Sequence, residues 1–528
     1  MIIDLNTTQN VNNLVSDIVI VGAGAVGITL AVTLTRAGKK VLLLESGGSQ
    51  FEKKSQELNL FKLSGKHHDG ISDGRARVVG GSTTLWGGQL VPFSEIDFKK
   101  RDWIPNSGWP ISFKDLAPYY KKTAELLGLA AKYSDDEKVW QSLNIEEVSL
   151  GPNVKPFLTK WLKETNIFQI FKEEIENSHN MTLVKHAITA GFDCEISSNV
   201  VSDVIIYNSN NQEFKISAKN IVIACGTIEA SRLMLFAAEK NQYLLWKNNQ
   251  YVGAFFQDHL NIHIAKVLPI DKKLFSQAFD NIFIGGRKYQ PKLRLSEEFQ
   301  KQSKCLNIAS SFIFDSSFSE QLSNVKIFAR SLLRGSVPEN WRNLPQHIKT
   351  IFSIFVPMAM RYIKDRRILN FSDKGIYLNL HCEQVPVMDS RISLDWSKLD
   401  SANMPATDLN WKIDSREISS MSDFCIELDR QLRSKGLAKL EISEKLKALD
   451  KDLIESCIDT NHQCGGLKMA LSKDEGVVDK NLKVFGTRNL YIAGAATFPT
   501  SSFANSTFTA MSLGLRLADE LIAREGES

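Results

Sequence analysis

Long apolar runs, paired cysteines and an excess of charge of one sign are all missing from this sequence. No stretch approaches the roughly 20 consecutive apolar residues that a membrane-spanning helix needs, so the sequence predicts no integral membrane protein. Lysine and arginine total 64 against 60 aspartates and glutamates, a net charge of +4. This near balance argues against a dedicated nucleic-acid binder.

The cysteines give no framework for disulfides or metal. Seven cysteines are scattered along 528 residues, with no CxxC pair that would indicate zinc or redox chemistry. The segment 1–16 is polar and rich in asparagine, unlike a secretory signal. We therefore expect reduced thiols and a cytoplasmic protein. Apolar residues make up 43% and charged residues 23%, which is typical of a globular chain with one large core or two domains.

A nucleotide-binding pattern opens the chain. Its parts are an apolar strand over 17–21, the turn Gly22-Ala-Gly-Ala-Val-Gly27, a helix over 28–36 and a strand over 40–45 that ends in Glu45. This order predicts a βαβ unit that binds an ADP-containing cofactor.

Each residue of the pattern has a physical role. Gly22 permits the tight turn, Gly24 lets the backbone approach a pyrophosphate, and Gly27 lets the helix pack closely on its strand. The N-terminus of the helix offers unpaired N–H groups and positive potential to phosphate. Glu45 is expected to accept a hydrogen bond from a ribose hydroxyl and to repel a 2′-phosphate, which disfavours NADP.

Three further segments contain glycine turns. They are 75–88, which is glycine-dense around Trp86; 220–230, a strand entering a turn and helix; and 489–500, a strand and turn followed by Asn505-Ser-Thr507 and an apolar helix over 508–521. The first of them is too rich in glycine for a regular element and suits backbone lying against a flat ligand.

Taken together, these motifs resemble the glucose-methanol-choline (GMC) family of FAD-dependent oxidoreductases. The likeness rests on the N-terminal unit, Gly80-Gly81-Ser82, Ile223-Ala-Cys225-Gly226, Gln257-Asp258-His259, His462-Gln-Cys-Gly465, and Phe498-Pro-Thr500 with Asn505. With asparagine at position 505, the sequence resembles pyranose oxidases and cholesterol oxidases more than family members that carry histidine there. The resemblance implies a CH–OH oxidoreductase, with a sugar or glycoside as the favoured substrate.

The resemblance also implies bound FAD and names the residues that hold it. They are Gly22, Gly24, Ala25, Gly27, Glu45, Gly80, Gly81, Ser82, Trp86, Cys225, Gly226, Gly494, Ala495 and Thr507. Trp86 either packs beneath the flavin or stacks on it. Leu85 stands where pyranose oxidases carry a histidine bonded to the flavin, so we expect non-covalent FAD. Gly494 and Ser506 replace an acid and a proline that are common in the family.

The candidate catalytic residues are His462 and Asn505, which lie 43 residues apart. Loss of a hydride from an alcohol carbon requires a base for the hydroxyl proton, and His462 is the candidate. Asn505 cannot titrate, but its amide can position the substrate oxygen. His259 and His263 do not complete a zinc-ligand pattern, so no metal is predicted. His67 and His68 are expected on a solvated loop.

The predicted fold is α/β, with a Rossmann-like FAD domain built from discontinuous segments and an α+β substrate domain with a mostly antiparallel sheet. The FAD domain takes 1–125, 180–265 and 456–528, and the substrate domain takes 266–455. Within the latter, 376–382 and 390–395 are predicted strands, and 414–432 is a core helix with an Asp414/Glu417 capping pair and Gly436 as its stop.

An insertion over 322–367 is basic around an apolar core, 350–360. It could serve as a lid, a subunit contact or a peripheral membrane segment. Two other functions stay open at this point: an FAD-containing lyase without net redox turnover, and a flavin-binding subunit of a membrane-associated complex. The electron acceptor is not encoded in any of these motifs.

Overall fold

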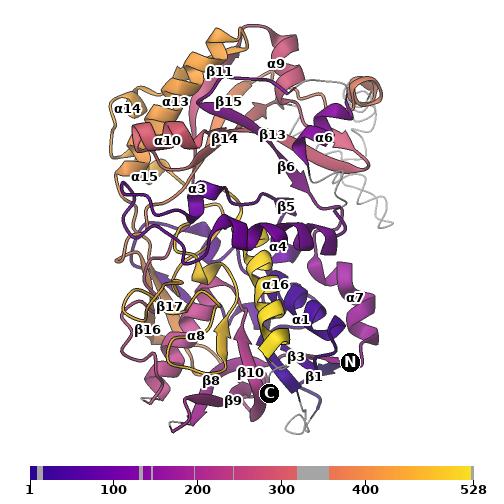
Figure 1. Ribbon diagram of the computed structural model, residues 1–528, viewed down its shortest axis with the longest axis vertical. Helices are drawn as coiled ribbons and strands as arrows, with labels where there is room; N and C mark the ends of the chain where they lie inside the picture. Colours follow the sequence, from indigo (N-terminus) through magenta and orange to yellow (C-terminus); the bar gives the residue numbers. More distant parts are fainter. Residues whose placement is uncertain are drawn as a thin grey trace, which may run out of the picture.

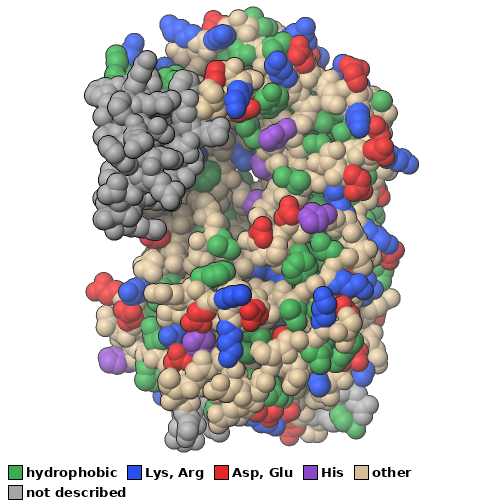
Figure 2. Space-filling view, turned by 180° about the vertical axis from the view of Figure 1, so that it is seen from behind, with side chains coloured by type: hydrophobic (Ala, Val, Ile, Leu, Met, Phe, Trp, Pro, Cys, Tyr) green, Lys and Arg blue, Asp and Glu red, His purple; other side chains and the backbone are tan. Residues whose placement is uncertain are grey.

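A computed structural model describes residues 1–8, 16–129, 135–143, 147–195, 197–241, 243–317 and 356–524. The predicted insertion therefore lies outside the described residues except for 356–367, of which 356–365 are helical. Within the described ranges, no helix combines the length and the apolar character needed to cross a bilayer. Acidic and basic side chains are interspersed over the face seen in Figure 2.

The first sheet carries the predicted nucleotide-binding unit. Its order is β1 (Ile2–Asp4), β7 (Met181–Lys185), β3 (Val41–Leu44), β2 (Ser16–Val21), β10 (Glu213–Ile223), β9 (Val200–Tyr207) and β8 (Ile188–Glu195), and β19 (Leu490–Ile492) also pairs with β10. The pairs from β1 to β10 and the β10–β19 pair are parallel, whereas β9 pairs antiparallel with both β8 and β10. The strands predicted at 17–21 and 40–45 are confirmed as the paired β2 and β3, and the strand predicted from residue 489 is confirmed as β19, which pairs with β10.

Helices pack on this sheet and join distant parts of the chain. They are α1 (Ala25–Arg36), α4 (Phe113–Leu126), α7 (Ile167–Asn177), α8 (Thr227–Lys240) and α16 (Ser506–Arg524). α1 contacts α7 and α16, and α16 also contacts α4. The C-terminal helix therefore lies beside the first helix of the chain (Figure 1).

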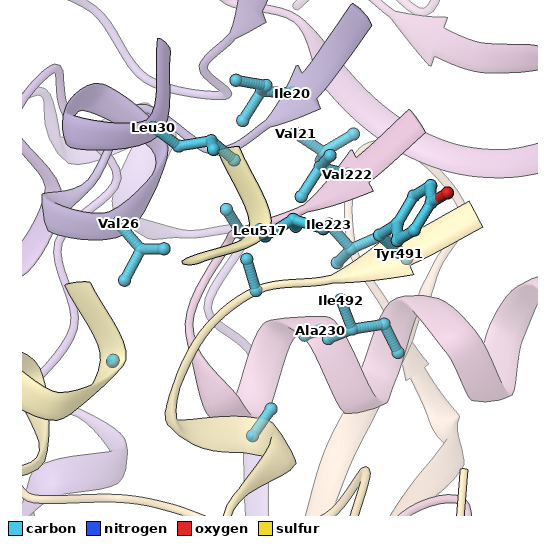
Figure 3. Close-up of a cluster of buried hydrophobic side chains, with 14 of the residues drawn as sticks. Ile20, Val21, Val26, Leu30, Val222, Ile223, Ala230, Tyr491, Ile492 and Leu517 are labelled. Atoms are coloured by element: carbon cyan, nitrogen blue, oxygen red, sulfur yellow. The ribbon is translucent and has the colours of Figure 1, made fainter. Parts of the chain in front are cut away.

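The core between these layers is apolar and closely packed. Ile20 on β2, Ile223 on β10 and Ile492 on β19 are fully buried. Figure 3 shows them with Leu30 of α1 and Leu517 of α16. Each such side chain contributes about 1.5–3 kcal/mol by leaving water. The β-branched runs seen in the sequence form this core because their strands are covered on both faces.

The second sheet is antiparallel and forms the upper part of the molecule in Figure 1. Its order is β18 (Ala438–Ile442), β11 (Leu260–Pro269), β15 (Gly375–Cys382), β14 (Ile308–Asp315), β13 (Arg287–Leu295), β6 (Val154–Trp161) and β5 (Gln89–Leu90), with β12 (Ile282–Ile284) on β13. The α/β fold class with an antiparallel second sheet is confirmed. β5 and β6 lie outside the predicted range 266–455, and the boundary at 265 falls inside β11.

A third, small sheet joins β16 (Arg391–Leu399), β17 (Pro405–Asn410) and β4 (Phe61–Leu63). The strand predicted at 390–395 is confirmed as β16. Its partner β17 pairs with β4 from the N-terminal part of the chain. The shorter helices are α2 (Lys53–Gln56), α3 (Glu95–Phe98), α6 (Asp136–Gln141), α9 (Lys272–Phe279), α10 (Glu297–Ser303), α14 (Glu444–Lys447) and α15 (Leu453–Ser456).

The predicted helix at 414–432 is α13 (Arg416–Ser434), which packs on the second sheet. Its predicted capping pair is wrong. Asp414 accepts a hydrogen bond from the backbone of Arg416, but Glu417 turns inward, is fully buried and accepts from the Val385 backbone N–H at 2.9 Å. Burial raises the pKa of Glu417 to about 8. Gly436 ends the helix region with φ +64°, as predicted.

The close approach of α1 to the turn before it depends on Gly27. A Cβ at this position would meet the Gly22 carbonyl oxygen at 1.9 Å, whereas a Cβ at Gly24 would meet nothing within 4 Å. Gly27→Ala should lower the free energy of unfolding by about 3 kcal/mol, because backbone must move to relieve the clash. Gly24→Ala should cost less than about 1 kcal/mol. Urea unfolding of the ligand-free protein measures both, and equal losses would contradict this packing.

Candidate active site

A cavity of about 550 Å³ lies at the carboxyl ends of the parallel strands. This is where ligands bind in open α/β sheets, and the volume is in the range of sites for large cofactors. Of the predicted cofactor-binding residues, those that line the cavity are Gly22, Gly24, Ala25, Glu45, Gly81, Ser82, Trp86, Cys225, Gly226, Gly494, Ala495 and Thr507. Four segments that are far apart in the sequence therefore meet at one surface.

Gly27 and Gly80, also predicted, are not among the lining residues. Both act on the backbone of the turns instead. Gly27 brings α1 against the first turn, and Gly80 donates its N–H to the Ala23 carbonyl at 2.9 Å. Gly80 has φ +102°, which favours glycine. The glycine-dense loop is thereby held against the first turn.

The N-terminus of α1 opens into this cavity without a side-chain cap. Gly24 is the N-cap residue and makes no side-chain hydrogen bond, and Ala25 begins the helix at the cavity wall. The free N–H groups and the positive end of the helix dipole suit a phosphate group. This observation, with the cavity volume, fits a dinucleotide cofactor.

Glu45 is placed at the cavity but is already hydrogen-bonded. Its carboxylate accepts from the Ala23 N–H at 3.1 Å and from the Gly47 N–H at 2.9 Å. Burial raises its pKa, and these two bonds partly oppose the rise. Glu45 therefore also ties the end of β3 to the first turn, a structural role that the sequence did not reveal.

His462 and Asn505 both line the cavity and meet there. The Asn505 side-chain amide donates to Nε2 of His462 at 2.6 Å. Asn505 directly precedes α16, and Ser506 and Thr507 at the start of that helix also line the cavity. The structure thus brings the two candidate catalytic residues into direct contact.

A chain of hydrogen bonds sets the proton position on His462. The Ser501 carbonyl lies 3.0 Å from Nε2 of His259, so that nitrogen carries a proton and donates. Burial lowers the pKa of His259, which keeps the ring neutral and leaves its Nδ1 as an acceptor. Nδ1 of His462 lies 3.0 Å from that acceptor and 2.7 Å from the Thr460 hydroxyl oxygen. His462 therefore carries its proton on Nδ1 and keeps a lone pair on Nε2.

His462 is held neutral over a wide pH range. Burial and the nearby His259 and Lys292, partly opposed by Asp258, lower its pKa to about 3. Above that pH the Nε2 lone pair is available to accept a proton.

Asp258 fixes the positions of His259, Thr460 and His462 through hydrogen bonds. Its Oδ1 accepts from the backbone N–H groups of His259 at 2.7 Å and of His462 at 3.0 Å, and from the Thr460 hydroxyl at 3.2 Å. Asp258 is fully buried. Burial alone would raise its pKa, but the hydrogen bond from His68 and the surrounding imidazoles hold the pKa below its ordinary value.

His68 was expected on a solvated loop, and that prediction is wrong. Its ring is buried, with Nε2 3.1 Å from Asp258 Oδ2 and its edge against Phe256 and Trp411. His67, its neighbour, is exposed as predicted. His68, Asp258 and Asp459 present possible metal-ligand atoms within 4.8 Å of one another. Asp459 accepts from the backbone N–H groups of Asp69 and Gly70, and Asp258 Oδ2 is paired with His68 Nε2.

Two side chains of the glycine-dense loop also border the cavity. Trp86 donates its indole N–H to the Thr165 carbonyl at 2.6 Å, which fixes the plane of the ring. Leu85 offers no atom for a covalent bond to a cofactor. Across the cavity, burial raises the pKa of the Cys225 thiol, so it is not a thiolate nucleophile.

Sequence reasoning missed three members of the site: Thr460, Asp258 and His259. The tripeptide Gln257-Asp258-His259 was noted as a motif without a role. Its position just before β11, whose first residues pair with β15, was the only signal available.

Replacement of Asp258 tests its role as the support of His462. Asp258→Asn should lower the free energy of unfolding by about 1–3 kcal/mol, because the amide removes the charge and leaves buried donors poorly paired. Asp69→Asn is the control, since its pair with His67 is exposed and should contribute less than about 1 kcal/mol. Denaturant unfolding at pH 7 measures both. Equal, small losses would show that Asp258 supports nothing.

Comparisons with known proteins show which proteins the chain resembles. Residues 386–514 match the family model described as GMC oxidoreductase. The chain is 20% identical to the fructose dehydrogenase large subunit of Gluconobacter japonicus, over 96% of this chain and 98% of that one. It is 21% identical to the 2-methyl-1,2-propanediol dehydrogenase of Mycolicibacterium austroafricanum, over 96% and 95%.

The fold agrees as well. A solved structure of a formate oxidase variant from Aspergillus oryzae RIB40 superposes with a TM-score of 0.58 at 15% identity, covering 98% of this chain and 100% of that one. The chain therefore resembles GMC oxidoreductases over residues 386–514 and shares its overall fold with this oxidase.

Proposed function

We propose that this protein oxidises the CH–OH group of a sugar or glycoside, with FAD in the cavity and His462 as the proton acceptor. The observation that carries the proposal is the 2.6 Å contact of His462 Nε2 with the Asn505 amide at the cavity wall. It pairs a neutral base with a fixed hydrogen-bond donor. Oxidation of an alcohol carbon needs both groups around one oxygen atom.

The proposed cofactor is non-covalent FAD. The uncapped N-terminus of α1 would hold the phosphates of FAD. Glu45 lines the cavity, where its carboxylate would accept a hydrogen bond from the ribose. When bound, FAD supplies the acceptor for the hydride that leaves the alcohol carbon. Leu85 and the neutral Cys225 thiol support the absence of a covalent link.

His462 and Asn505 have different roles in this proposal. The lone pair on Nε2 accepts the hydroxyl proton as the C–H bond breaks, and the carbon is left as an aldehyde or ketone. With substrate bound, the Asn505 N–H donates to the substrate oxygen and no longer to Nε2 of His462. This hydrogen bond keeps the reacting carbon in position. Asp258 and Thr460 keep the imidazole from turning.

The sugar class is supported by the resemblance of the C-terminal motif to pyranose oxidases and by the relative named fructose dehydrogenase. A cytoplasmic location stays a prediction from the cysteines. The contact through 322–367 also stays a prediction. At its described end, Met360 and Ile363 are 66% and 74% exposed, which is consistent with a partner surface.

The cofactor proposal is tested by Gly24→Ala, the variant expected to preserve stability. Its added methyl group enters open space at the cavity wall, where the backbone is expected to approach a pyrophosphate. We expect FAD affinity to fall by about tenfold or more, equivalent to about 1.4 kcal/mol. Titration of the ligand-free protein with FAD, followed by flavin fluorescence, measures this. Unchanged affinity would place the cofactor elsewhere.

The catalytic proposal is tested by anaerobic reduction of the bound flavin in a screen of sugars and simple alcohols. His462→Ala should slow reduction by about 10²–10⁴-fold through loss of the base. Asn505→Ala should slow it by about 10²-fold. His67→Ala, an exposed histidine, serves as the control. Because the pKa of His462 is about 3, the native rate should not fall through its protonation between pH 8 and 5.

The ratio of FAD to protein must be the same in all variants for the comparison to hold. If the flavin keeps its yellow colour with a substrate that is consumed, the reaction is a lyase reaction instead. If His462→Ala reduces at the native rate, His462 is not the base.

A further inference from the structure

Lys292 is a buried cation that has no counter-charge among the described residues. It lies on β13 and is only 8% exposed. Among the described residues, no carboxylate, carbonyl or hydroxyl pairs with its ammonium group. Burial, followed by the nearby Lys288, lowers its pKa to about 8, so it remains largely charged at pH 7. A buried charge without a partner is costly, which points to a ligand that supplies one.

The position of Lys292 ties it to the catalytic pair. It borders a second, small cavity of about 20 Å³ together with His462 and Asn505. The remaining walls are Gln89, Val91, Phe157, His381, Phe503 and Ala504. No carboxylate lines this cavity, so Lys292 carries the only formal charge on its described walls.

The elements packed around Lys292 leave the positive charge unbalanced. Lys288 lies four residues earlier on the same face of β13, with its ammonium 4.3 Å from the centre of the Trp161 ring. On β15, burial and the charge of Lys292 keep the pKa of His381 well below its ordinary value, so that ring is neutral. Two buried acids of the site region are engaged elsewhere, Glu383 with Arg101 at 2.5 Å and Asp258 with His68.

We propose that Lys292 binds a carboxylate of the substrate, and that the enzyme acts on alcohols which carry a carboxylate close to the reacting hydroxyl, such as hydroxy acids and sugar acids. This inference rests on the proposed function, since it assumes that the hydroxyl faces His462. The cavity has room for about one water-sized group. A carboxylate oxygen fits such a space, whereas a phosphate ester is too bulky.

The charge of Lys292 has one other use that must be separated from binding. A cation beside His462 could stabilise negative charge on any substrate oxygen during proton loss. In that case its removal would slow neutral and acidic alcohols equally. Selective loss for carboxylates distinguishes recognition from this general effect.

The first test measures binding without turnover. The holoenzyme is titrated with acetate and with its neutral isostere acetamide, and the flavin absorbance reports binding. We expect acetate to bind, and Lys292→Met to weaken it by about tenfold or more, or about 1.4 kcal/mol. Lys292→Arg, which keeps the charge, should retain most of the affinity. Lys288→Met, which removes a cation outside the cavity wall, should change it less than about threefold.

The second test measures selectivity in anaerobic flavin reduction. Lactate is compared with propane-1,2-diol, and glucuronate with glucose, because each pair differs in one carboxylate. Native enzyme should favour the acid of at least one pair, and Lys292→Met should abolish that preference while Lys292→Arg preserves it. A preference for the neutral member that Lys292→Met leaves unchanged would overturn the proposal.

The two tests separate failure of the inference from failure of the proposed function. Acetate binding that depends on Lys292, without reduction by any alcohol, supports the carboxylate site and contradicts the proposed reaction. Reduction by neutral alcohols with no Lys292-dependent binding of acetate overturns the carboxylate site and leaves the reaction intact. An equal slowing of acidic and neutral alcohols in Lys292→Met also overturns it.

Discussion

The hydrogen bonds to one buried carboxylate, that of Asp258, determine where the reactive imidazole lies. Oδ1 of Asp258 accepts from the backbone of His462 and from the Thr460 hydroxyl, and that hydroxyl lies against the His462 ring. A buried acceptor with several donors is strongly stabilising only if all of its partners stay in place. The segment that carries His462 is therefore fixed to the strand β11 of the second sheet, and the ring cannot swing away from the cavity.

The same contacts that position His462 also select its tautomer. His259 is committed to the Ser501 carbonyl through Nε2, so its other nitrogen can only accept from His462. The Nε2 lone pair of His462 then faces Asn505. One hydrogen-bond network thus sets the tautomer of His462, the orientation of its ring and its contact with the Asn505 amide. The network joins residues next to β11, residues before β19 and the residue before α16.

Local patterns predicted the elements of the fold well. The βαβ unit, the strands at 376–382 and 390–395, and the C-terminal helix each combine a clear hydrophobic period with turn residues at their ends. The cavity was also predictable in outline, because Gly22, Gly226 and Gly494 each follow a strand whose carboxyl end must meet the others in a parallel sheet. A glycine directly after a strand usually permits a tight turn or a close approach of the backbone to a ligand, so its role could be predicted from the sequence.

The errors arise where tertiary contacts decide the environment of a polar residue. His68 and Glu417 are adjacent to polar segments in the sequence, yet both are buried by strands and helices that lie hundreds of residues away in some cases. Lys292 follows the same rule, because alternation along β13 does not reveal that its face lies over the catalytic pair. Sequence periodicity assigns a side chain to one face of a strand or helix, but it does not show which other residues pack against that face.

The protonation state of His462 is the most direct test of this account. Protein labelled with ¹⁵N-histidine, with FAD bound, would give the imidazole ¹⁵N shifts of His462, assigned by comparison with His462→Ala. The account predicts a neutral ring with its proton on Nδ1 at every pH from 8 to 5. A charged imidazolium in that range, or a proton on Nε2, would contradict it.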